Sequence, residues 1–130
     1  MPRAYTIATA ALALHVPTKW LDNVLSHFQV QGVSQAKQGV ARRLSVQSLT
    51  VLAIAVLLIK DLELPTRKAL TIASLLLHSR GSATLSSGVQ IQINVEQTIT
   101  ELLERLERAV EIAPLPRRGR PPQKTTGRLD

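Results

Sequence analysis

The chain contains no cysteine and only one residue each of Trp, Tyr and Phe among its 130 residues. The absence of cysteine excludes disulfide bonds, thiolate metal sites and cysteine nucleophiles. Since aromatic residues are so few, Leu, Ile, Val and Ala have to form the core, which suits helices packed on helices. His15, His27 and His78 are scattered, without carboxylates at metal-ligand spacing, and no glycine-rich loop follows a strand. We therefore expect no enzymatic activity, no catalytic residue, no metal and no cofactor.

The net charge of +7 is concentrated at the two ends of the chain. Residues 1–43 carry five basic side chains and one acidic, residues 44–112 six and seven, and residues 113–130 five and one. Two basic ends around a near-neutral middle indicate a polyanionic partner that is held at both ends. Nucleic acid is the first candidate, and we expect double-stranded DNA.

Two apolar segments could be mistaken for export or membrane signals. The start of the chain, with Arg3 before residues 9–14, imitates a signal peptide, but His15 and Pro17 interrupt it after a short run. The apolar run 49–59 is far shorter than the roughly 20 residues that cross a bilayer, so we interpret it as a buried helix. We expect a cytoplasmic, nucleoid-associated protein that does not bind membranes.

The first 78 residues predict two pairs of helices separated by a hairpin. Thr6 and Ser45 are suitable N-caps, and Pro65 is expected at the first position of the last helix. Two short helices joined by a tight turn and followed by a small hairpin form a winged helix-turn-helix. Polar side chains of the second helix can reach phosphates or base edges, and the amide of Asn23 suits adenine. The helices are expected over 6–14, 18–27, 46–60 and 65–78, and the hairpin strands over 28–33 and 40–44.

The second part of the chain predicts one strand and one helix after a linker over 79–88. Residues 89–95 alternate between apolar and polar, and residues 96–112 carry an apolar stripe at helical spacing. Apart from the hairpin, this strand has no predicted partner in its own chain, so we expect a second copy to cover both strand and stripe in a homodimer. The predicted dimerisation residues are Val89, Ile91, Ile93, Val95, Ile99, Leu102, Leu106 and Val110.

The order helix, turn, helix, hairpin, helix, turn, helix resembles the DNA-binding domain of the MerR family over residues 5–78. The residues that carry the resemblance are Tyr5-Thr6-Ile7, His15-Val16-Pro17-Thr18, Arg42-Arg43-Leu44-Ser45 with Leu49, and Leu62-Glu63-Leu64-Pro65. In that family the second helix enters the major groove, while the wing and later helices contact the DNA backbone. The resemblance implies a bacterial or phage source. It also implies DNA-contacting roles for Thr18, Lys19, Asn23, Lys37, Arg42 and Arg43.

The chain departs from the family pattern at several positions. His15 stands where the turn usually has a glycine, although His enters the left-handed backbone region more readily than most residues. Asn23-Val24 replace the paired aromatics expected in the second helix, and Val40 or Ala41 replaces the aromatic of the second wing strand. From this sequence we expect neither the long dimerisation helix nor the effector domain of the family. The closer analogy is therefore to the small, effector-free members, including excisionase-like proteins.

The tail over 113–130 has four prolines, two glycines and scattered basic residues, and we expect it to be disordered. Within it, Arg-Arg-Gly-Arg-Pro-Pro-Gln-Lys over 117–124 resembles an AT-hook. Gly119 would let the backbone lie on the floor of the minor groove, where Arg118 and Arg120 extend along A·T tracts. The predicted DNA contacts of the tail are Arg117, Arg118, Gly119, Arg120 and Pro121. The alternative is a generic basic tail that only screens phosphates.

These expectations combine into a mainly α fold. A winged helix-turn-helix domain covers residues 1–78, a strand-plus-helix dimerisation element covers 79–112, and a disordered basic tail covers 113–130. The predicted function is sequence-preferring binding of double-stranded DNA by a transcriptional regulator or a recombination-site architectural factor. The alternative is an antitoxin-type protein, in which the strand and the last helix mask a toxin and DNA binding serves autoregulation.

Overall fold

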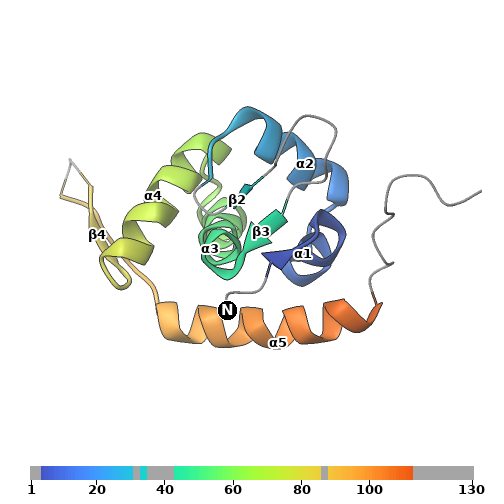
Figure 1. Cartoon of the computed structure of the whole chain (residues 1–130). Helices are drawn as coiled ribbons and strands as arrows, with labels where there is room; N and C mark the ends of the chain where they lie inside the picture. Colours follow the sequence, from blue (N-terminus) through green and yellow to red (C-terminus); the bar gives the residue numbers. More distant parts are fainter. Residues whose placement is uncertain (1–3, 31–32, 35–42, 86–87, 113–130) are drawn as a thin grey trace, which may run out of the picture.

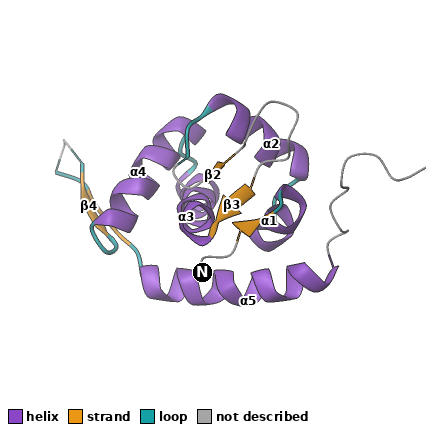
Figure 2. Cartoon of the chain, in the orientation of Figure 1, coloured by secondary structure: helices purple, strands orange, loops and turns teal. Residues whose placement is uncertain are grey.

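The computed structural model describes residues 4–30, 33–34, 43–85 and 88–112 (Figure 1). Helices predominate over strands, which confirms the predicted mainly α class (Figure 2). The elements in chain order are β1 (Ala4–Tyr5), α1 (Ile7–Leu14), α2 (Thr18–His27), β2 (Val33–Ser34), β3 (Arg43–Ser45), α3 (Val46–Leu62), α4 (Thr66–His78), β4 (Ser82–Thr84), β5 (Gln90–Gln92) and α5 (Val95–Ile112).

The centre of the molecule is α3, with α1, α4 and α5 packed around it (Figure 1). Every residue over 48–56 is buried, because a helix covered on all sides has no polar face to present to water. This confirms the interpretation of the apolar run 49–59 as a buried helix. One hydrophobic cluster contains side chains from each of α1 to α5, so the last helix shares a core with the first four.

Local signals in the sequence determine where α1, α3 and α4 begin. The side-chain oxygen of Thr6 accepts a hydrogen bond from the Thr9 N–H, and that of Ser45 accepts one from the Ser48 N–H, both at 3.2 Å. Both predicted N-caps are therefore confirmed. Pro65 differs slightly from its predicted place, because it is the N-cap of α4 rather than its first helical residue.

The turn between α1 and α2 contains a residue in the left-handed backbone conformation. His15 adopts φ 59° and ψ 44°, and its N–H donates a hydrogen bond to a carbonyl of the last turn of α1. The left-handed residue reverses the chain within three residues, so that α2 begins at Thr18 as predicted.

A small antiparallel sheet has the strand order β1-β3-β2, and its central strand β3 contacts both α1 and α3. The register pairs Ala4 with Ser45, Tyr5 with Leu44, Val33 with Leu44 and Ser34 with Arg43. Residues 31–32 and 40–42 of the predicted hairpin strands lie outside the described residues, and the edge strand β1 was not predicted. Alternation over 28–33 suggested a strand, but Phe28 is the C-cap of α2 and packs partly buried against the core.

The expected linker over 79–88 contains a strand, which corrects the sequence interpretation. β4 pairs antiparallel with β5, with Ser82 opposite Gln92, Ala83 opposite Ile91 and Thr84 opposite Gln90. The predicted strand over 89–95 is therefore shorter, and its partner lies in the same chain. The expectation that a second copy must supply this partner is therefore wrong. The sequence analysis missed β4 because a strand of three residues is too short to show a clear alternation of apolar and polar residues.

Gly81 makes the approach to β4 possible. It adopts φ 103°, and its carbonyl accepts a hydrogen bond from the Ile93 N–H at 2.8 Å. A Cβ atom at this position would lie 2.4 Å from the Ile93 oxygen, so only glycine fits without a shift of the backbone. The preceding residue, Arg80, also has a positive φ, 60°.

The apolar stripe of α5 is covered by its own chain, which corrects a second expectation. Leu102, Leu106 and Ala109 are buried where α5 packs against α1 and α3. The premise that this stripe faces water in a single copy is therefore wrong for these positions. Ile99 is half-buried and Val110 is 39% exposed, so these two residues lie at the margin of the contact.

Candidate nucleic-acid interface

The second helix, α2, has one face in the core and one face in solvent. Leu21, Val24 and Leu25 are buried, and they fix the orientation of the helix. The polar side chains project from the opposite side. The exposed polar residues of this face are Thr18, Lys19, Asp22, Asn23 and Ser26.

Three of these side chains are available for a ligand. Thr18, Lys19 and Asn23 make no side-chain hydrogen bond or ion pair within the described ranges of the chain. By contrast, the Ser26 hydroxyl donates to the Asp22 backbone oxygen at 2.9 Å. The predicted DNA contacts on α2 are therefore all exposed and on one helix.

The β2–β3 strand pair contributes Arg43 to the described surface. This residue is exposed on β3, while its neighbour Leu44 is fully buried, as the alternation of a strand requires. Lys37 and Arg42 lie outside the described residues. The predicted contacts of the tail, Arg117, Arg118, Gly119, Arg120 and Pro121, also lie outside them.

The sequence analysis missed a basic residue beside the end of α2. The guanidinium carbon of Arg67, in the first turn of α4, lies 5.1 Å from the centre of the Phe28 ring. Phe28 caps α2, so this cation–π contact holds a positive charge next to the C-terminal end of the helix. The sequence analysis missed this contact because residues 28 and 67 are far apart in the chain. Nothing in the sequence around Arg67 sets it apart from the other basic surface residues.

The predicted dimerisation residues do not form one exposed face. Val89 is 52% exposed, Ile91 is half-buried opposite Ala83, and Leu102 and Leu106 are in the core. Val89 and Ile91 lie in the β4–β5 hairpin and Ile93 follows β5, whereas the other five residues lie on α5. A single flat interface through all eight residues is therefore not available.

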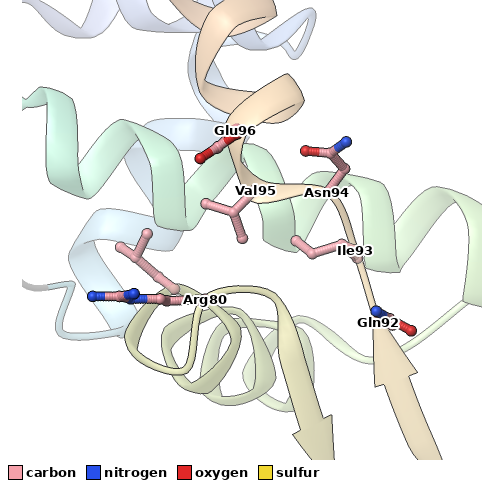
Figure 3. A pocket seen from close by; sticks show the side chains of 7 residues that line it. Arg80, Gln92, Ile93, Asn94, Val95 and Glu96 are labelled. Carbon is pink, nitrogen blue, oxygen red and sulfur yellow. The ribbon is translucent and has the colours of Figure 1, made fainter.

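An open pocket of about 760 Å³ lies between the end of α4 and the start of α5 (Figure 3). Arg80 and Glu96 bring one basic and one acidic group to a lining that is otherwise amide and aliphatic. No group of three or more His, Asp or Glu side chains that could hold a metal occurs among the described residues. We assign no chemistry to this pocket. Its lining residues are Leu77, Arg80, Gln92, Ile93, Asn94, Val95 and Glu96.

Comparisons with protein families, with curated proteins and with solved structures found no match to this chain. Within the part of the chain that the structure describes, none of the helices is long and apolar enough to span a membrane.

Proposed function

We propose that the chain binds double-stranded DNA with sequence preference, as a transcriptional regulator or a recombination-site architectural factor. In this proposal α2 enters the major groove and the hairpin between β2 and β3 acts as a wing against the phosphate backbone. In this proposal the domain over residues 1–78 is a winged helix-turn-helix like those of the small, effector-free members of the MerR family.

The observation that carries the proposal is the polar outer face of α2 on a buried inner face. Leu21, Val24 and Leu25 anchor the helix, so the exposed side chains keep a constant relation to one another. Asn23 can pair with adenine in two hydrogen bonds, and Lys19 can reach a phosphate. A helix fixed in the core that exposes Thr18, Lys19 and Asn23 to solvent has the properties that direct base readout requires.

Basic side chains around α2 support the same proposal. Arg43 on the wing is exposed, and Arg67 is held beside the end of α2 by Phe28. Lys37 and Arg42 add charge to the hairpin sequence. Phosphate contacts of this kind position a protein on the duplex and supply most of its non-specific affinity.

We further propose that the basic tail acts as an AT-hook. Arg118 and Arg120 flank Gly119 in a core that matches the hook pattern, and Pro121 restricts the chain to extended conformations. The hook would read the minor groove next to the major-groove site of α2.

The experiment that tests the proposal is selection of bound fragments from random duplexes, followed by affinity measurement on the recovered site. We expect an enriched site, and we expect Asn23→Ala to weaken binding to that site more than to unrelated duplexes. The matched control is Arg108→Ala, because Arg108 is exposed on α5, away from α2. Failure to enrich any sequence, with equal affinities for wild type and Asn23→Ala, would contradict the proposal.

A further inference from the structure

One edge of the buried face of α5 carries apolar side chains that its own chain leaves partly exposed. Leu103 is 44% exposed and Val110 is 39% exposed, and Ile99 is half-buried on the same side. These three positions are spaced by four and seven residues, so they form one line along the helix. We call this line the outer seam. It runs directly beside the inner face of Leu102, Leu106 and Ala109, which is buried.

Acidic side chains flank the outer seam in a protein that is otherwise basic. Glu107 lies four residues after Leu103 and three before Val110, so it is next to both on the helix surface. Glu96 lies three residues before Ile99, so it is next to Ile99 on the helix surface. Glu104 lies one turn before Glu107 and Arg108, farther from the seam on the same side. Glu96, Glu104 and Glu107 are all exposed. Five of the nine acidic residues of the chain are on α5.

We infer that the outer seam docks a basic amphipathic segment of another protein, with apolar side chains against Leu103 and Val110 and Lys or Arg opposite the glutamates. An apolar line with a charged flank is the pattern by which one helix recognises another. The inference does not depend on the proposed function.

The charge pattern disfavours a second copy of this chain as the occupant. If two α5 helices paired antiparallel across a two-fold axis, the flank with Glu104 and Glu107 would face the same flank of the other copy. Like charges set against each other weaken such pairing and select against it. A basic partner meets the same flank with complementary charge.

The position of α5 allows a partner to bind together with DNA. Figure 1 shows α5 along the bottom of the molecule and α2 at the top, with α1 and α3 between them. A partner on the outer seam would therefore leave the polar face of α2 accessible.

The test uses the full chain and a fluorescein-labelled helical peptide with leucines at three- and four-residue spacing and lysines on both flanks. The net charge of the protein, +7, repels such a peptide, so binding reports a local site rather than bulk attraction. Fluorescence anisotropy should show binding of this peptide, and no binding of a scrambled peptide with the same composition. Absence of binding by the amphipathic peptide would overturn the inference.

Variants distinguish the seam from other surfaces. Leu103→Ser should weaken peptide binding about tenfold or more, whereas Leu75→Ser, at a residue 50% exposed on α4, should leave it unchanged. Glu104→Lys combined with Glu107→Lys should abolish binding. Asp61→Lys combined with Glu63→Lys makes the same change of net charge at exposed positions at the C-terminal end of α3, and should retain most of the peptide binding.

Equal losses in the two charge-reversed variants would show a net-charge effect and overturn the inference. Sedimentation of the free chain provides the second readout. If the chain were a dimer that Leu103→Ser converts to a monomer, a second copy would occupy the seam and the basic-partner inference would be wrong.

Discussion

The Nε atom of Arg105, in the middle of α5, donates a hydrogen bond to the backbone oxygen of Ala13 at 2.7 Å. Ala13 is in the last turn of α1, where carbonyl groups have no partner within the helix. The contact therefore joins residues 92 positions apart and ties α5 to α1. A positive charge at the C-terminal end of α1 also interacts favourably with the helix dipole.

Arg105→Ala should lower the free energy of unfolding by about 1–2 kcal/mol, because a partly buried carbonyl loses its charged donor. Urea denaturation followed by circular dichroism measures this loss. Arg108→Ala, at an exposed position on the same helix, should cost less than about 0.5 kcal/mol. Similar losses in the two variants would show that the Ala13 contact adds nothing.

Gly81→Ala should lower the stability by about 2–4 kcal/mol, because the new Cβ meets the Ile93 oxygen and φ is 103°. Gly88 provides a matched control. It also has a positive φ, 81°, but its Cβ would meet open space, so Gly88→Ala should cost only about 1 kcal/mol. Thermal unfolding measures both, and a Gly81→Ala variant as stable as Gly88→Ala would contradict the close approach of β4 to the segment before α5.

His15→Val should destabilise the protein by about 1–2 kcal/mol, because a β-branched residue strongly disfavours the left-handed conformation that the turn between α1 and α2 requires. His15→Gly removes the same exposed side chain without this strain, and should be neutral or stabilising. Denaturant unfolding of the two variants compares them directly. Equal stability would mean that the turn does not depend on this backbone geometry.

Lys19→Ala and Arg43→Ala should each weaken binding to all duplexes about equally, since phosphate contacts carry no base information. Each should also reduce the slope of log affinity against log salt by roughly one unit. Asn23→Ala should instead relax the preference at one base pair by about 1–3 kcal/mol. Titrations at several salt concentrations measure these effects. Full affinity and an unchanged salt slope in Lys19→Ala and Arg43→Ala would place the DNA on another face.

Gly119→Val separates a minor-groove hook from a polyelectrolyte tail, because it keeps every charge and adds bulk where the chain must pass closest to the groove floor. We expect it to reduce affinity for A·T-flanked sites nearly as much as truncation after residue 112 does. On G·C-flanked sites the effect should be small, since the guanine amino group already obstructs the groove. Titrations at one salt concentration measure this, and equal binding of both proteins to both flanks would leave only a basic tail.

Features that depend on neighbouring residues were predictable from the sequence of this protein. Thr6 and Ser45 each cap a helix by a bond to a residue three positions ahead, and His15 enters the left-handed turn through its own backbone preference. The exposed positions of Thr18, Lys19 and Asn23 likewise follow from helical periodicity, because the apolar side of α2 has to be buried.

Tertiary structure alone decided the features whose partners are distant in the chain. The sequence marked an apolar stripe on α5, but only packing against α1 and α3 determined that Leu102 and Leu106 are buried while Leu103 and Val110 stay exposed. The three-residue strand β4 and the contact of Arg67 with Phe28 have no periodic signal either. Local propensity determines where an element begins and ends. Which of its sides is buried and which is exposed depends on the free energy of burial against elements elsewhere in the sequence.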